Sequence, residues 1–222
     1  MKCRYPILLA ITLPFILSAC TLLGGKAAEE PVYRVTLKDG PIEVREYEGY
    51  AIARTTVTAS YREATRMGFR RLFGYITGDN QTTADIDITA PVLITPQSQT
   101  IEMTAPVLIE PQAGSKEAST LADDGIDAWS VAFVLPQGYT KASAPQPQNE
   151  RITVMDIDAH RIACIVFRGR LNDKSAEASR KELEKWLEAR GLEHAGDWQI
   201  AGYNPPWTLP ALRRNEVLVS LP

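Results

Sequence analysis

A carboxylate in an apolar pattern is the first candidate for chemistry in this sequence. Within residues 42–47, Ile42 and Val44 alternate with charged residues, and strict alternation along a strand places Glu46 on the same face as these two apolar side chains. A carboxylate in such a place is unfavourable unless it is paired or has a function. Glu46 is therefore a candidate ligand or general base. The alternative is that the strand ends or bulges before Glu46.

Arginines form the second candidate, a basic flank in a chain of 222 residues with 24 basic and 27 acidic side chains. They are Arg62, Arg66, Arg70 and Arg71. Guanidinium groups match the geometry of carboxylates, so this flank could bind an anionic group of a ligand. The alternative is that these arginines are solvated or pair with carboxylates on the surface.

Histidine and cysteine are too scarce for several kinds of site. The chain has two histidines, of which we expect His160 in a turn and His194 in a surface loop. Together with Cys164 they have no spacing that fits a zinc motif, so we predict no structural metal.

The helix that carries the arginines is the clearest element. Apolar and small residues recur at helical spacing from Tyr61 to Ile76, which predicts a helix with one continuous buried face. Ser60 and Glu63 predict a capping box at its start. The four arginines lie off the apolar stripe, on the flank of this helix.

A nine-residue phrase occurs twice, at residues 86–94 and 101–109, with seven identical positions. Small polar residues and a proline separate the copies, which predicts two strands joined by a polar turn. Pro91 and Pro106 each remove a ladder donor in mid-phrase, so each marks an edge or a bulge.

The remaining elements repeat in two halves. Alternation and turn residues predict strands at 33–38, 42–46, 51–57, 129–135, 152–157, 161–167, 198–203 and 216–221, and a second helix at about 173–190. Residues 136–149 are rich in proline and are expected to link the halves, about 32–135 and 151–221, which share a ββαββ order. We predict an α+β fold with a closed or nearly closed antiparallel sheet, two helices on it and a ligand groove at the seam.

The N-terminus indicates a lipoprotein signal. Lys2 and Arg4 precede an apolar run that is too short to span a bilayer and that ends in Leu-Ser-Ala-Cys, a sequence that resembles a bacterial lipobox. We predict a signal over residues 1–19 and lipidation at Cys20; the alternatives are a plain signal peptide or an uncleaved anchor. Thr21 resembles the outer-membrane sorting pattern, which predicts a lipid anchor in the outer membrane of a bacterial envelope, facing the periplasm.

Processing at Cys20 would change the chain that remains. Residues 20–31 would form a lipidated tether and residues 32–222 the folded domain. The formal charge would fall from −3 to −5, because Lys2 and Arg4 leave with the signal, and such a chain is a poor partner for nucleic acid. Of three cysteines only Cys164 would stay unmodified, so no intrachain disulfide is expected.

Several phrases together resemble the SOUL haem-binding family, in the order in which that family has them. They are Glu30-Pro31 with Tyr33, residues 42–47 (IEVREY), 68–76 (GFRRLFGYI), 103–107 (MTAPV), 202–207 (GYNPPW) and 213–217 (RRNEV). The resemblance covers about residues 30–221. It implies a distorted β-barrel of two ββαββ repeats flanked by two helices, akin to the gyrase-inhibitor-like effector-binding domains.

The same resemblance implies a tetrapyrrole ligand in an apolar pocket beside the first helix. A propionate-binding arginine of the family falls on Arg66, and apolar pocket positions fall on Phe69 and Phe73. Two lysines of the family are replaced, one by Gly74 and one near Thr208. An axial histidine of some members corresponds to Glu46, and a carboxylate is a poorer ligand for haem iron than imidazole.

Three functions follow from these residues. The leading hypothesis is an envelope-anchored, non-enzymatic protein that binds haem, a porphyrin or another flat hydrophobic ligand through Arg66, Phe69 and Phe73, without a fixed axial ligand. The second, from related effector-binding folds, is a hydrolase of small electrophiles with Glu46 as general base and Tyr203 as donor. The third is a non-catalytic envelope scaffold.

Overall fold

The computed structural model describes residues 29–81, 99–111, 127–204 and 208–222. The predicted signal, Cys20, most of the predicted tether and the first copy of the repeated phrase lie outside the described residues. Among the helices that are described, none combines the length and apolar character that a membrane span needs.

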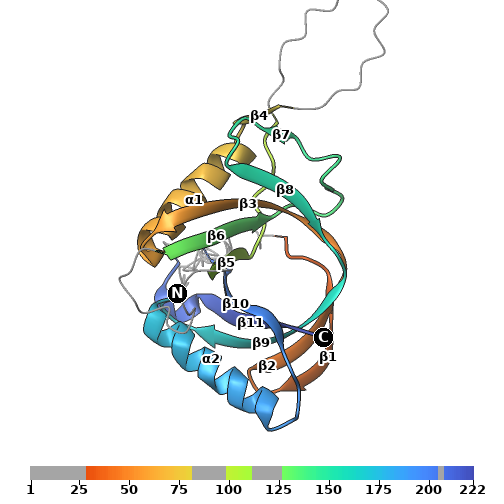
Figure 1. The fold of residues 1–222 in the computed structure, drawn as a ribbon, viewed down its shortest axis with the longest axis vertical. Helices are drawn as coiled ribbons and strands as arrows, with labels where there is room; N and C mark the ends of the chain where they lie inside the picture. Colours follow the sequence, from red (N-terminus) through yellow and green to blue (C-terminus); the bar gives the residue numbers. More distant parts are fainter. Residues whose placement is uncertain (1–28, 82–98, 112–126, 205–207) are drawn as a thin grey trace, which may run out of the picture.

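Strands dominate the described chain, with two long helices between them (Figure 1). The first half contains β1 (Tyr33–Asp39), β2 (Ile42–Tyr47), β3 (Tyr50–Ala59), α1 (Tyr61–Ile76), β4 (Asn80–Gln81), β5 (Val107–Pro111) and β6 (Asp127–Val134). The second contains β8 (Ile152–Ile157), β9 (His160–Arg168), α2 (Asp173–Glu188), β10 (Ala195–Gly202), the short 3-10 helix η1 (Pro210–Leu212) and β11 (Arg214–Leu221). The short strand β7 (Gln146–Pro147) lies between the halves and pairs with β4.

Nine of the strands form one antiparallel sheet in the order β1-β2-β9-β11-β10-β5-β6-β3-β8. The predicted α+β fold with two ββαββ units is therefore confirmed. The two units are β2-β3-α1-β5-β6 and β8-β9-α2-β10-β11, and in each the first strand pairs with the other unit. β2 pairs with β9 of the second unit, and β8 pairs with β3 of the first. The order from β2 to β8 reads the same from both ends when the halves are interchanged, so a pseudo-twofold axis passes between β10 and β5. Among the described strands β1 and β8 are the sheet's edges, so the ladder is open between them.

Both helices cover the same face of this sheet. α1 packs on β3 and β6 over a core that includes Val131 and Phe133, and α2 packs on β9 and β11 over a core that includes Ile165 and Val217. Figure 1 shows that the sheet curves away from the helices, which lie on its outer, convex side. The concave face is lined by two further groups of side chains, one around Tyr47 and Leu218 and one around Ile52 and Val134.

Local sequence explains most of the element bounds, with two exceptions. The predicted capping box of α1 is wrong, because Ser60 makes no side-chain hydrogen bond to the helix, whereas α2 has such a box between Asn172 and Ser175. The second copy of the repeated phrase forms a strand only from Val107 onwards. An earlier residue of this copy pairs with α1 instead of with a strand: the N–H of Ile101 donates to the carbonyl oxygen of Ile76, the last residue of α1, at 2.7 Å.

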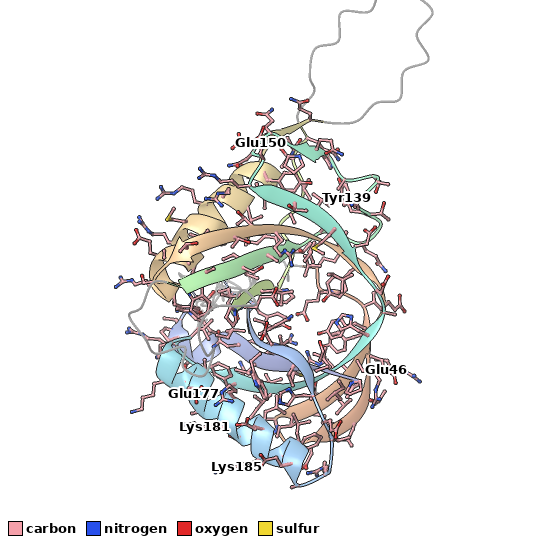
Figure 2. The ribbon with its side chains drawn as sticks, viewed as in Figure 1. Glu46, Tyr139, Glu150, Glu177, Lys181 and Lys185 are labelled. Carbon is pink, nitrogen blue, oxygen red and sulfur yellow. The ribbon has the colours of Figure 1, made fainter. Side chains whose placement is uncertain are left out.

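The outer face of α2 carries two ion pairs between residues one helical turn apart. Lys181 lies 3.4 Å from Glu177, and Arg180 lies 3.2 Å from Glu184. Figure 2 shows Glu177, Lys181 and Lys185 along the side of α2 that points away from the sheet. Pairs of this spacing contribute only about 0.3–0.5 kcal/mol each, so the buried stripe of α2 fixes its position.

The approach of α1 to the sheet depends on one glycine. A Cβ atom on Gly68 would lie 2.7 Å from the Cβ of the fully buried Val131 and 2.6 Å from its Cγ2. We expect Gly68→Ala to lower the free energy of unfolding by about 1–3 kcal/mol, the usual cost of overpacking a core. Urea unfolding followed by circular dichroism measures this change.

Gly74→Ala on the same helix is the matched control. A Cβ there would meet only the carboxylate of Asp79, which is exposed and can rotate away. This variant should be neutral or gain up to about 1 kcal/mol from alanine's higher helix propensity. Equal effects of the two substitutions would show that the distance between α1 and β6 is not limited by Gly68.

Candidate functional site

The predicted ligand residues of α1 form an exposed aromatic surface. The rings of Phe69 and Phe73 are stacked with centroids 5.9 Å apart and planes 11° apart, and Phe69 meets Phe133 of the sheet edge-on at 5.2 Å. Phe73 is 44% exposed, a large value for an aromatic side chain. Arg66, Phe69 and Phe73 are spaced i, i+3 and i+7 and so share one side of the helix. We call these three residues the α1 aromatic face.

Arg66 is available to a ligand but is not in a cavity. Its guanidinium lies 3.3 Å from the carboxylate of Glu63, and both side chains are mostly exposed. A surface pair of this kind contributes only about 0–1 kcal/mol, so a ligand carboxylate could replace Glu63 at little cost. Arg71 instead donates to the backbone carbonyl of Thr56 at 3.2 Å, which fits the surface interpretation of the basic flank.

Glu46 is not buried among apolar side chains, so that expectation is wrong. Ile42 and Val44 do lie in the core against α2, but Glu46 comes at the end of β2, where it forms a 2.5 Å ion pair with Arg34. Its side chain is 38% exposed, and Figure 2 shows it at the outer edge of the sheet. The proposed donor Tyr203 binds Glu216 at 2.7 Å instead. The structure therefore does not bring the predicted base and donor together.

Glu46 does line a cavity, together with residues that the sequence did not single out. This space, which we call the rim cavity, has a volume of about 470 Å³. It opens where β1 and β2 meet the turn between β8 and β9, and its wall includes Tyr33, Arg34, Glu46, Tyr47, His160 and Arg161.

A second space, the concave cleft, lies at the seam of the two halves on the face opposite the helices. It measures about 230 Å³ and is lined by Leu108 and Glu110 of β5 and by Gln199 of β10. Burial raises the pKa of Glu110, which accepts a hydrogen bond from Gln199 at 2.9 Å. His160 lines this cleft as well as the rim cavity, so the two spaces are neighbours at this residue.

His160 is the first residue of β9 rather than a turn residue, and it is half-buried. Its imidazole stacks on Tyr47 with centroids 5.5 Å apart and planes 11° apart, and its Nδ1 lies 2.8 Å from the carbonyl oxygen of Asp158. The sequence signal for an inward-pointing His160 was its position directly before an alternating strand, because the first side chain of a strand can already point inward. His194, in contrast, is exposed beside Trp198.

A buried charge network lies on the concave face. Arg45 and Glu216 are almost completely buried and form a two-point ion pair of 2.8 and 2.9 Å, which Glu43 and Arg214 extend. Arg214 also holds Glu30 at 2.9 Å. Glu43 and Arg45 are out of phase with Ile42 and Val44, and that was the sequence signal that a charged inner face existed.

Other reactive groups are accounted for. Burial raises the pKa of the Cys164 thiol to about 12, so it stays protonated and is a poor nucleophile. Burial also raises the pKa of Tyr203 above its usual value. Within the described ranges no group of three or more His, Cys, Asp and Glu side chains could hold a metal ion.

These features define a class of protein: one curved antiparallel sheet, made of two ββαββ units, with both helices on its convex side and ligand-sized spaces on its concave side. The family follows from comparison. The chain belongs to the SOUL heme-binding protein family, whose model matches residues 28–100 and 95–220. The predicted resemblance is therefore confirmed.

Relatives agree with this assignment, and solved structures share the fold. The chain is 28% identical over 200 residues to heme-binding protein 1 of Xenopus laevis, covering 89% of this chain and 93% of that protein. Heme-binding protein 1 of Xenopus tropicalis is also 28% identical, over 81% of this chain and 84% of that protein. Among solved structures, the EcmrR C-terminal domain matches with a TM-score of 0.54 at 10% identity, covering 86% of this chain and 98% of that one. A hydrolase from Listeria innocua matches with a TM-score of 0.51 at 9% identity over 84% and 94% of the two chains, and both matches show the fold alone.

Removing the carboxylate of Glu216 should be costly, because it pairs with both Arg45 and Arg214, and the buried Arg45 would keep only Glu43 as a counter-ion. We expect Glu216→Gln to lower the free energy of unfolding by about 3–5 kcal/mol. Glu46→Gln is the matched control, since it breaks an arginine pair of similar length that is exposed, and it should cost no more than about 1 kcal/mol. Urea denaturation of both variants measures the difference, and similar losses would contradict the role given to burial.

Proposed function

We propose that this protein binds haem or a related tetrapyrrole, and that the α1 aromatic face is the surface on which the ring lies. Membership in the SOUL family supports the ligand class, as do relatives that are named heme-binding protein 1. The observation that carries the site is the exposed stack of Phe69 and Phe73 with Arg66 on the same side of α1.

The chemistry of these residues fits a tetrapyrrole. A flat apolar ring can extend the stack from Phe73 and cover ring area that water now contacts. Arg66 can leave Glu63 and bind a propionate with two hydrogen bonds. Both histidines of the chain lie outside α1, at positions 160 and 194. Binding at this face therefore comes from stacking and charge and does not require iron.

The α1 aromatic face can be tested with iron-free protoporphyrin IX and haem. Arg66→Glu should weaken the affinity for both compounds by about 1–3 kcal/mol, the range for losing a charged hydrogen bond. Phe73→Ala should weaken both by a similar amount, because buried apolar area is lost. Tryptophan fluorescence and the ligand-induced rise in melting temperature measure the affinities of the full-length protein in detergent.

Two variants of the same helix serve as controls. Arg71→Gln removes an arginine that lies five residues after Arg66, on another side of the helix, where it donates to Thr56. Met67→Ala removes an exposed apolar side chain, also from another side of α1. Both should bind protoporphyrin like the wild type. If neither porphyrin raised the melting temperature, the ligand would be wrong and a non-catalytic scaffold would be favoured.

We further propose that Cys20 carries a lipid that anchors the protein in a bacterial envelope, with the domain facing the periplasm. The support is the lipobox-like sequence and the short tether before β1. Cys20→Ala should lose incorporation of radiolabelled palmitate and move from the membrane fraction to the soluble fraction. Cys164→Ala, which changes a cysteine buried in the domain, should keep both properties. Labelled, membrane-bound Cys20→Ala protein would exclude this anchor.

A further inference from the structure

The rim cavity lies at the β1–β2 end of the sheet, away from the strands that carry α1, and is built differently from the α1 aromatic face. Its volume of about 470 Å³ falls within the range of about 300–1,000 Å³ that is typical of pockets for drug-sized and cofactor-sized ligands. The four described cavities do not include residues of the α1 aromatic face. A ligand in the rim cavity would therefore occupy a second site.

The imidazole of His160 is held in one tautomer at the edge of this cavity. A carbonyl oxygen can only accept, so the 2.8 Å contact with Asp158 means that Nδ1 carries the proton. In the neutral ring Nε2 then has a free lone pair, and no hydrogen bond to it occurs in the part of the chain that the structure describes. A backbone carbonyl on the second nitrogen is the usual way in which proteins orient a metal-binding histidine.

The stack on Tyr47 fixes the ring without blocking Nε2. Tyr47 covers a face of the imidazole, whereas a metal binds in the plane of the ring, along the Nε2 lone pair. Tyr50 packs against the same imidazole with centroids 5.8 Å apart. The side chain is thus prevented from rotating before any ligand arrives, which lowers the entropy cost of binding.

The remaining wall suits the periphery of a tetrapyrrole. Tyr33, which is partly exposed and whose ring lies 5.0 Å from that of the buried Tyr47, supplies aromatic surface for a flat ring. Arg34 and Arg161, both exposed, stand where carboxylates of the ligand would emerge into water. Arg34 is paired with Glu46, which lines the same cavity, so this arginine can exchange a protein carboxylate for one of the ligand's.

We propose that the rim cavity is a second, iron-dependent haem site in which His160 would hold the iron through Nε2. This inference rests on the tetrapyrrole ligand proposed above but not on the α1 aromatic face. Imidazole is a common protein ligand of haem iron, and one such ligand suffices to hold it. The two sites differ in one property: α1 binds a porphyrin with or without iron, whereas the rim cavity prefers the iron compound.

The test titrates the full-length protein in detergent with ferric haem and, separately, with iron-free protoporphyrin IX. Wild-type protein should take up more haem than protoporphyrin, and its visible and electron paramagnetic resonance spectra should show imidazole-bound haem. His160→Ala should lose the imidazole signature and weaken haem binding at this site about tenfold or more, while protoporphyrin binding stays unchanged. Free imidazole added to His160→Ala should restore the signature.

His194→Ala is the matched control, since it removes the chain's other histidine, and it should keep the wild-type spectra. Ala159→Trp is a second variant, and it leaves the side chain of His160 unchanged. Ala159 is exposed and lines the rim cavity, so tryptophan there should fill the space and abolish the imidazole signature in a folded protein.

The outcomes separate this proposal from the function proposed above. Unchanged spectra in both His160→Ala and Ala159→Trp, or loss of the signature in His194→Ala, would overturn the rim-cavity site and leave α1 binding intact. Equal uptake of haem and protoporphyrin with no imidazole signature in the wild type would do the same. Binding of neither compound would remove the tetrapyrrole altogether.

Discussion

The ion pair between Arg45 and Glu216 is the interaction on which the concave side of the molecule depends. Two almost fully buried charges must be paired, because an unpaired charge in the interior would cost several kcal/mol. The pair joins β2 to β11 across β9, and Arg214 extends it to Glu30, shortly before β1. A strand near the start of the domain, its last strand and the point where the chain enters are therefore held by one network.

This network acts where the two halves exchange strands. β2 lies in the half of the sheet that α2 covers, and β8 lies in the half that α1 covers. A half taken alone would lack the strand that completes its sheet and would expose the ladder edge of β9 or β3. We therefore expect the halves to fold as one cooperative unit, in which the Arg45 pair selects the exchanged arrangement over two separate units.

The position of both helices on the convex face divides the surface into two environments for a flat ligand. On α1 the aromatic rings are exposed and only one guanidinium is aligned with them, so affinity there comes from contact area. The rim cavity is bounded by residues from three strands and contains an imidazole with a fixed tautomer. Glu46, the position at which the family resemblance implied an axial ligand, lines that same cavity one strand away from His160. Glu46 and His160 are thus side chains of two neighbouring strands that both border the rim cavity.

The local pattern of apolar and polar residues was sufficient to predict most of the helices and strands. The helical spacing of apolar residues gave α1 its observed bounds, and alternation located β1, β2, β3, β6, β8, β9 and β11 to within a few residues, because burial of one face imposes a period on each segment. The motifs of the family could also be recognised without a structure, because they are short stretches of sequence. These signals are local, and they led to the ββαββ order and to Phe69, Phe73 and Arg66 on one side of a helix.

Only the tertiary structure decided what each face meets. Alternation placed Glu46 with Ile42 and Val44, but α2 covers the strand only that far, so the carboxylate ends beside Arg34 at the edge. The same periodicity could not show that Arg45 would find Glu216 across another strand. Nor could it show that His160 would stack on Tyr47, because both contacts depend on the exchange of β2 and β8 between the halves. The periodicity of residues predicts whether a side chain is buried. Its contact partner depends on the order of the strands in the sheet, which cannot be predicted from the periodicity of one sequence.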